Sequence, residues 1–288
     1  MRPKIFVVTI FSALLVLACT STQNVTCERV EQQVTETPNP ITLIQVKSDT
    51  LFHSNQRIHM VALPKAALED YALELRYSAK TLHPTSWFGE TYGALAAVNG
   101  GYFDMDAGGS VTYLEIQDSV ICWTQPDVDS LKWAFPDSLI SGAVILTKSG
   151  NLVMEAVQPD SMYAQSSQEA AVLVVGPLLL QEGQKVSMPK ANFVANQHPR
   201  SYLATTPDEI LLISVDGRSK SAQGMSLYDA QEYLLSLGCL DAINLDGGGS
   251  TTLWVRGQGI VSHPSDLTGE RKVANAFVIV PRSKSTNN

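Results

Sequence analysis

The sequence has few charged residues and no excess of basic ones. The 288-residue chain has 20 lysine and arginine residues against 28 aspartate and glutamate, a formal net charge of −8 at pH 7. This balance argues against a nucleic-acid binder that relies on a broad basic field, although clustered arginines can still bind a phosphate. Hydrophobic residues make up 44% and charged residues 17% of the chain, as in a globular protein.

Long apolar runs are absent outside residues 1–18, and no later stretch is long enough to cross a bilayer. At the N-terminus, Arg2 and Lys4 precede a short apolar run, which is typical of a secretory signal. The run ends in Leu-Val-Leu-Ala before Cys19, which resembles a bacterial lipobox. We therefore expect a lipoprotein signal peptide, with Cys19 lipidated and an ordinary cleaved signal as the alternative. Because Thr20 and not Asp follows, the expected location is the cell envelope, at the outer membrane.

Residues 19–40 are rich in Thr, Gln, Asn, Glu and Pro, which predicts a flexible tether before a domain over 41–283. Cysteines are scarce, and with Cys19 assigned to lipid an odd number remains. A bridge between Cys122 and Cys239 is possible outside the cytoplasm, but two free thiols are favoured. No Cys-x-x-Cys motif or His/Cys cluster predicts zinc, and we expect no cofactor, with a divalent cation left open.

Short apolar segments bounded by turn residues recur through the domain and predict strands. The expected strands are 41–46, 57–63, 71–77, 94–98, 112–116, 120–123, 141–146, 152–157, 171–175, 178–180, 200–205, 209–215, 239–243, 253–255 and 272–280. A short helix is expected over 86–93, and a longer one between N-cap Ser226 and Gly238. Many short strands without strand–helix alternation predict a single α+β domain on an antiparallel or mixed sheet.

One stretch concentrates polar groups at the end of a predicted strand, where Asp246 is followed by Gly247, Gly248, Gly249, Ser250 and Thr251. Successive glycines leave backbone N–H groups uncovered, and such an array can form an anion-binding nest. The alternative is a plain Asp-Gly hairpin.

Two other predicted strands end in a similar junction, at Asn99-Gly100-Gly101 and at Asp216-Gly217-Arg218. If these strand ends converge, one cleft collects the three carboxylates Asp216, Asp246 and Glu270 together with Arg200 and Arg218. Arginine suits phosphate because its planar fork forms paired hydrogen bonds, and paired carboxylates suit glycoside cleavage. Each residue also has a structural reading: a turn for Asp216, surface charges for the arginines and Glu270, and a loop position for His198.

A set of motifs in a fixed order resembles the phosphodiester glycosidase family. The motifs are Asn99-Gly100-Gly101-Tyr102-Phe103, His198-Pro199-Arg200-Ser201, Asp216-Gly217-Arg218, Gly224-Met225-Ser226-Leu227, Leu237-Gly238-Cys239, Asn244 to Thr252 and Val273-Ala274-Asn275-Ala276. The resemblance covers roughly residues 90–280. The family pattern is closer to Pro-Arg-Thr-Ala, and Ser201-Tyr202-Leu203-Ala204 departs from it, so we expect a different local pocket and substrate.

The resemblance implies hydrolysis of the glycosidic bond of a sugar-1-phosphate diester in a phosphorylated glycan. Arg200, Arg218 and the Gly247–Ser250 amides would hold the phosphate, with Asn99, Gly101, His198 and Thr251 as further binding candidates. Asp246 or Glu270 would act at the sugar carbon or on water, and Asp216 would orient an arginine or a hydroxyl.

Two alternatives stay open. The chain could bind phosphorylated glycans without cleaving them, or act as a divalent-metal phosphodiesterase through its three carboxylates.

Overall fold

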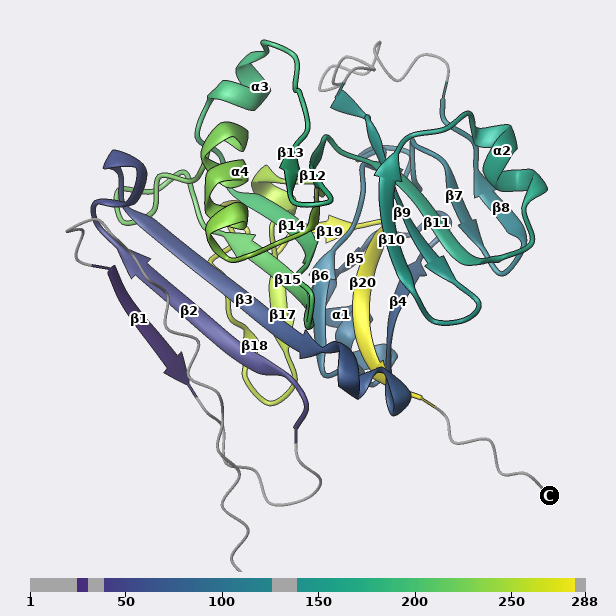
Figure 1. Cartoon of the computed structure of the whole chain (residues 1–288), viewed down its shortest axis with the longest axis horizontal. Coiled ribbons are helices and arrows are strands. Elements are labelled where there is room, and N and C mark those ends of the chain that lie inside the picture. The colour runs from purple at the N-terminus through teal and green to yellow at the C-terminus, as the bar shows by residue number, and fades with distance from the viewer. Residues whose placement is uncertain (1–24, 31–38, 126–138, 283–288) are drawn as a thin grey trace, which may run out of the picture.

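The computed structural model describes residues 25–30, 39–125 and 139–282 (Figure 1). Its strands are β1 (Val25–Val30), β2 (Thr42–Ser48), β3 (Gln56–Pro64), β4 (Tyr71–Tyr77), β5 (His83–Pro84), β6 (Ala96–Asn99), β7 (Leu114–Ile116), β8 (Ser119–Cys122), β9 (Gly142–Thr147), β10 (Leu152–Ala156), β11 (Glu169–Val175), β12 (Leu178–Gln181), β13 (Gln184–Lys185), β14 (Arg200–Thr205), β15 (Glu209–Val215), β16 (Asp241–Asn244), β17 (Leu253–Val255), β18 (Gly259–Ile260), β19 (Lys272–Val273) and β20 (Asn275–Pro281). The helices are α1 (Thr85–Thr91), α2 (Asp160–Gln165), α3 (Asn192–Ala195) and α4 (Leu227–Ser236).

Three sheets and one two-stranded ladder organise these strands. The largest sheet has the order β1-β2-β3-β15-β14-β16-β12-β13, and the two five-stranded sheets have the orders β10-β9-β11-β7-β8 and β18-β17-β6-β20-β4. The ladder joins β19 to β5. The strand pairs β7–β8, β9–β10 and β14–β15 each form an antiparallel hairpin. The fold is therefore α+β with few helices, as predicted.

The core lies on both faces of the largest sheet. Along β15, Ile210 and Leu212 pack into a cluster shared with the two smaller sheets, while Leu211 and Ile213 pack into a cluster shared with α4. Successive side chains point to opposite faces of a strand, so a strand buried on both faces reads as a continuous apolar run. The apolar runs at 209–215 and 200–205 thus belong to the centre of this sheet.

Helix α4 covers the outer face of the largest sheet (Figure 1). The Ser226 hydroxyl accepts the Asp229 amide at 3.1 Å, which satisfies one of the free N–H groups at the helix start. Leu227 and Leu234 are fully buried against the sheet, and burial of each such side chain contributes roughly 1.5–3 kcal/mol. Gly238, with φ of 76°, follows the helix and turns the chain toward β16.

The structure bears on the predictions made for the tether and for the cysteines. Strand β1 lies within the stretch expected to be a tether and pairs with β2, so the sheet begins before residue 41. Cys122 and Cys239 are free thiols; Cys239 is buried and Cys122 is half-buried. Residues 1–24, with Cys19, lie outside the described residues. Within the described ranges, no helix has the length and apolar character needed to cross a bilayer.

Candidate active site

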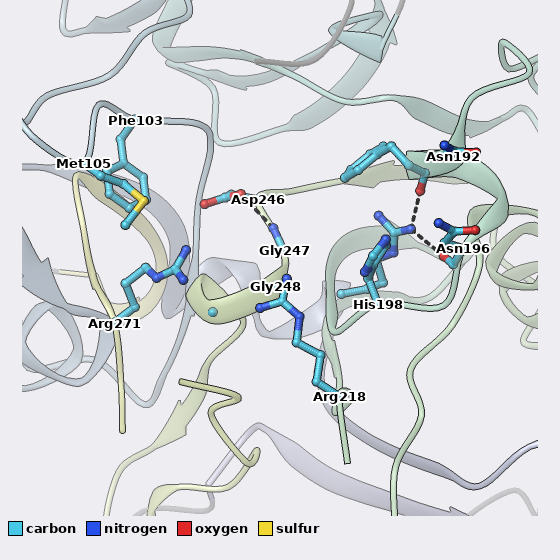
Figure 2. A pocket seen from close by; sticks show the side chains of 13 residues that line it. Phe103, Met105, Asn192, Asn196, His198, Arg218, Asp246, Gly247, Gly248 and Arg271 are labelled. Atoms are coloured by element: carbon cyan, nitrogen blue, oxygen red, sulfur yellow. Dashed lines mark hydrogen bonds between the residues drawn. The ribbon is translucent and has the colours of Figure 1, made fainter. Parts of the chain in front are cut away.

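A pocket of about 400 Å³ opens at the glycine-rich turn that follows β16 (Figure 2). It is lined by Phe103, Met105, Asn192, Phe193, Asn196, His198, Arg200, Arg218, Asp246, Gly247, Gly248, Gly249 and Arg271. Figure 2 shows Phe103, Met105 and Arg271 on one side of Asp246, and the side chains contributed by the α3 region on the other. The pocket therefore has an apolar side, an amide-rich side and a charged middle.

The turn connects two different sheets. Strand β16 pairs with β14 and β12 in the largest sheet, whereas β17 pairs with β6 in a five-stranded sheet. The alternative of an Asp-Gly hairpin is therefore wrong, because the strands before and after the turn do not pair with each other. The turn crosses between sheets and presents Asp246 at their junction.

Asn99, at the end of β6, stabilises the turn through hydrogen bonds of its side chain. Its Nδ2 donates to the Asp246 carbonyl at 2.7 Å, and its Oδ1 accepts the Ser201 hydroxyl at 2.6 Å and the Thr252 amide at 3.1 Å. The side chain is fully buried and does not line the pocket. Asn99 thus joins three strand ends and supports the site from behind, which differs from its expected contact with substrate.

The backbone amides of the turn do not form the expected nest. Gly247 N donates to Asp246 Oδ1 at 2.9 Å, Gly248 N to the Pro199 carbonyl at 2.9 Å, and Ser250 N to the Gly247 carbonyl at 3.2 Å. Three of the four amides in the predicted Gly247–Ser250 array thus already have acceptors within the protein. Gly247, Gly248 and Gly249 line the pocket.

Three other predicted binding residues lie beside the pocket and not in it. Gly101 donates its amide to Asn275 Oδ1 at 2.7 Å and packs against Leu173. Ser250 and Thr251 are buried below the turn. These residues shape the turn, and the structure gives them no place in the pocket lining.

Asp246 is half-buried and carries the only carboxylate among the pocket-lining residues that the structure describes. Burial raises its pKa from 3.8 to about 6, against the opposing effects of the Ser250 side chain, Arg271, the Gly247 amide and Arg218. The group is mostly ionised at neutral pH and can take up a proton slightly below it. Both properties suit a carboxylate that acts in catalysis.

Arg200 is fully buried, and no carboxylate pairs with it among the described residues. Its Nε donates to the Met225 carbonyl at 3.1 Å, and its Nη2 donates to the carbonyls of Phe193 at 2.5 Å and Asn196 at 3.2 Å. Nη1 is buried without a hydrogen-bond partner. Burial lowers the pKa of Arg200, but guanidinium stays protonated in proteins, so the pocket wall carries a positive charge. This charge lies over the Phe193 ring, 4.5 Å from its centroid, and has no carboxylate partner among the described residues.

Two further arginines flank the glycine turn. A Cβ on Gly248 would lie 2.8 Å from Arg218 Nη2, and one on Gly249 would lie 2.1 Å from Arg271 Nη2. Arg218 has φ of 59°, which is uncommon for a residue other than glycine and often marks a functional site. Arg271 donates from Nε and Nη2 to the two oxygens of Asp266 at 2.8 and 3.0 Å.

His198 lines the pocket between two of these arginines. Burial lowers its pKa, and the positive charges of Arg200 and Arg218 lower it further, so the ring is neutral at pH 7. It stacks on Phe193 with ring centroids 6.5 Å apart. The neutral ring can donate to or accept from a polar ligand without adding charge.

The other two predicted catalytic carboxylates do not line the pocket. Asp216 accepts His59 Nε2 at 3.0 Å and the His263 amide at 2.8 Å. Glu270 accepts the Ser86 amide at 2.8 Å and the Ser86 hydroxyl at 2.6 Å, and burial raises its pKa. Both carboxylates use their oxygens within the protein, so the structure does not support direct roles for them on substrate.

This placement also separates the carboxylates of the suggested metal site. In the described part of the chain, no group of three or more His, Cys, Asp or Glu side chains is placed to hold a metal ion. Asp216, Asp246 and Glu270 therefore do not supply the oxygen ligand set that a divalent-metal phosphodiesterase reading requires.

Sequence reasoning missed half of the pocket wall. Phe103 lies inside one of the motifs, and Arg271 directly follows the candidate Glu270, so the sequence contained a reason to predict both as pocket residues. Met105, the α3 residues Asn192 and Phe193, and Asn196 directly after α3 had none, because no helix is expected there from apolar spacing. The apolar and amide sides of the pocket emerge only from the fold.

Together, a β-rich α+β domain and a pocket with several arginines and one carboxylate define a protein suited to an anionic substrate. The model of the phosphodiester glycosidase family matches residues 92–280. The chain belongs to the phosphodiester glycosidase family.

Sequence relatives match only short parts of the chain. It is 42% identical over 84 residues to the SPbeta prophage-derived uncharacterized protein YomE of Bacillus subtilis. The matched stretch covers 29% of this chain and 13% of that protein. It is 41% and 40% identical over 58 residues to N-acetylglucosamine-1-phosphodiester alpha-N-acetylglucosaminidase of Bos taurus and Homo sapiens, respectively. The matched stretch covers 20% of this chain and 11% of each relative.

Solved structures show the same fold over most of the chain. The catalytic domain of the zebrafish N-acetylglucosamine-1-phosphodiester alpha-N-acetylglucosaminidase superposes with a TM-score of 0.64 at 19% identity, over 90% of this chain and 88% of that domain. A hypothetical protein from Synechocystis superposes with a TM-score of 0.59 at 15% identity, over 84% of this chain and 62% of that one.

Proposed function

We propose that this chain hydrolyses the glycosidic bond of a sugar-1-phosphate diester in a phosphorylated glycan. The observation that carries the proposal is the pocket in which Arg200, Arg218 and Arg271 surround the single carboxylate of Asp246. The three guanidinium groups carry one more positive charge than the carboxylates of Asp246 and Asp266 neutralise, so the pocket favours an anion. The family and the activity for which the mammalian relatives are named support a phosphodiester as that anion.

Arg200 is the strongest reason to expect a bound phosphate. A buried charge without a counter-ion is costly, and burial beside a pocket lets a ligand supply the missing charge. The unpartnered Nη1 offers a donor, and guanidinium matches the oxygens of a phosphate. A neutral sugar hydroxyl would leave that charge uncompensated.

The residues fit cleavage at the sugar carbon. The bond between the anomeric carbon and the bridging oxygen breaks, and its electron pair stays on the phosphate oxygen. The arginines stabilise that developing charge, so a protonated acid on the leaving group is not required. A water oxygen forms the new bond to carbon, and its proton passes to Asp246, or Asp246 first stabilises the positively charged sugar carbon. Both roles need an ionised carboxylate.

The experiment is hydrolysis of N-acetylglucosamine-1-phosphate methyl diester by the purified chain in water enriched in oxygen-18. Glycosidic cleavage gives free sugar labelled at the anomeric oxygen and unlabelled methyl phosphate. Attack at phosphorus, as in a metal phosphodiesterase, would instead label a phosphate product and would fall when a chelator is added. Tight binding of the diester without any product would show a binding protein and overturn the enzymatic proposal.

We also propose that the mature chain is exported and held at the cell envelope by lipid on Cys19. The support is the sequence pattern at residues 1–19: a basic start, an apolar run and a lipobox-like end. A tethered enzyme would meet phosphorylated glycans of the envelope or its surroundings, with the outer membrane as our preferred site.

A further inference from the structure

The loop that brings Arg271 to the pocket is long and irregular. It runs over residues 261–271, between β18 and β19, without regular secondary structure. Besides Arg271 it carries Asp266, which holds the Arg271 guanidinium, and Ser265, which lies 3.5 Å from Arg218 Nη1. The position of this loop therefore sets the position of one pocket arginine and touches a second.

The Arg271 guanidinium lies close to both the glycine turn and Asp246, so its position matters for both. Figure 2 shows its guanidinium beside the glycine turn, on the Phe103 side of Asp246. The Nη2 atom would lie only 2.1 Å from a Cβ on Gly249, so the arginine packs directly on the turn. Its charge lowers the pKa of Asp246, which shows that it acts on the carboxylate from this position. A small shift of the loop would change both contacts.

Asp216 anchors the first part of the loop. Its Oδ1 accepts the amide of His263, and its Oδ2 accepts Nε2 of His59, which comes from β3. His59 Nδ1 lies 3.2 Å from Nε2 of Gln45 on β2, so the anchor extends across the largest sheet. Asp216 itself is 5% exposed. The loop is thus attached to the buried residue that directly follows β15.

Glu270 anchors the other end of the same loop, one residue before Arg271. Both of its oxygens bind Ser86 at the start of α1, one through the backbone amide and one through the hydroxyl. Helix α1 packs on β6, β17 and β20 through Phe88, which is fully buried. The second anchor is therefore attached to a helix that packs into the core.

We propose that Asp216 and Glu270 are positioning residues, which fix the two ends of loop 261–271 and thereby place Arg271 beside Asp246 and the substrate phosphate. This inference rests on the proposed function, because Arg271 matters to catalysis only if the pocket binds an anion. Neither carboxylate reaches the pocket, so each acts through the loop and not on the substrate.

The test is a double-mutant cycle on the full chain. Asp216→Ala and Glu270→Ala are measured alone and combined with Arg271→Ala. The readouts are kcat/KM for N-acetylglucosamine-1-phosphate methyl diester, affinity for inorganic phosphate by calorimetry, and Tm. Because a small misplacement of a catalytic group can cost up to about 100-fold, we expect each single change to lower kcat/KM by roughly 10- to 100-fold. With Arg271 already removed, each should cost less than about twofold more.

Conservative variants and a control separate positioning from general stability. Asp216→Asn and Glu270→Gln retain an acceptor oxygen for the His263 or Ser86 amide and should recover much of the activity. If Glu270→Ala does not fold, Ser86→Ala removes the hydroxyl partner alone and takes its place. Asp160→Asn is the matched control, since Asp160 binds the amide and hydroxyl of Thr124 at 2.8 and 3.1 Å and does not line the pocket. It should leave phosphate affinity unchanged.

The proposal is overturned if the anchor variants leave both kinetics and phosphate affinity unchanged, or if their effects are the same with and without Arg271. Failure of the proposed function has a different signature. If the parent chain does not cleave the diester, the cycle on phosphate affinity still reports whether the anchors place Arg271, and full additivity there overturns the inference.

Discussion

The backbone amide of Gly248 donates to the carbonyl oxygen of Pro199 at 2.9 Å. This bond joins the glycine turn to the segment that leads into Arg200. A Cβ on Gly247 would lie 2.8 Å from the same carbonyl, and one on Gly217 would lie 2.6 Å from Pro199 N. Two glycine motifs that are far apart in sequence therefore pack on one proline, and this close approach explains glycine at these positions.

Substitutions in the turn should separate packing from binding. Gly247→Ala places a methyl group against the fixed Pro199 backbone, so we expect Tm to fall by several degrees. Gly249→Ala places one against Arg271 Nη2 at 2.1 Å and Asp266 Oδ1 at 2.3 Å, which are side-chain atoms that can move. It should weaken phosphate binding and lower kcat/KM more than it lowers Tm. Calorimetry and thermal melts on both variants check this contrast. If the two variants lost the same amount of phosphate affinity and the same amount of Tm, the prediction would be contradicted.

Arg218 offers a cleaner test of phosphate binding than Arg200. Arg200→Ala removes three hydrogen bonds to main-chain carbonyls, so it should also destabilise the fold. Arg218 is exposed and its side chain contacts Ser265 only at 3.5 Å. Arg218→Ala should weaken binding of a phosphodiester by about 10-fold or more, since a charge-assisted hydrogen bond contributes roughly 1.5–3 kcal/mol, while Tm stays the same.

Two comparisons complete that prediction. Arg218→Lys should recover only part of the affinity, because an ammonium cannot form the paired bonds of a guanidinium. Binding of free N-acetylglucosamine should change little in either variant. An equal loss for the sugar and the phosphodiester would place Arg218 against the sugar.

The sequence supports the fold better than it supports the site. Apolar runs and turn residues predict the main strands and α4, because burial on both sheet faces leaves a continuous signal along the chain. They miss the short strands β5, β13 and β18 and the helices α2 and α3, because these elements are too short to show a periodic pattern. They also predict one strand over 272–280, where the structure has β19 and β20. For the site, Asp246, Arg200 and Arg218 do line the pocket as expected.

Glu270 and Arg271 show why the rest of the site could not be read. They are neighbours in one irregular loop, yet Glu270 binds Ser86 at α1 while Arg271 reaches the pocket. Side-chain direction in a loop has no fixed period, unlike in a strand, so sequence alone does not say which of the two faces the substrate. Asp216 is similar: its position after a strand is visible, but its partners His59 and His263 are distant in sequence.

Lipid attachment predicts a change of location on substitution of one residue. Cys19→Ala removes the thiol that would carry the lipid, so the mature protein should move from the membrane fraction to the soluble fraction. The parent should incorporate a fatty-acid probe and the variant should not. A parent that stays unlabelled by the probe would contradict the lipoprotein prediction.

Asp246→Asn tests the catalytic carboxylate while it keeps the shape of the side chain. If ionised Asp246 stabilises the sugar carbon or accepts the proton of water, turnover should fall by roughly 100-fold or more. In the parent, kcat/KM should decline as the pH falls below about 6, because protonation removes the required charge. The variant's residual activity should lose this acidic limb, which a pH–rate profile of both proteins will show.

Stability gives an independent check with a defined sign. Burial raises the pKa of Asp246 from 3.8 to about 6, so the folded state binds a proton more tightly than the unfolded state. The ionised carboxylate therefore destabilises the fold above pH 6, and this cost disappears as the pH falls toward 3.8. Asp246→Asn should raise Tm at pH 8 more than at pH 5. A variant that loses turnover and gains stability at pH 8 identifies a carboxylate retained for chemistry; normal turnover would remove Asp246 from the reaction.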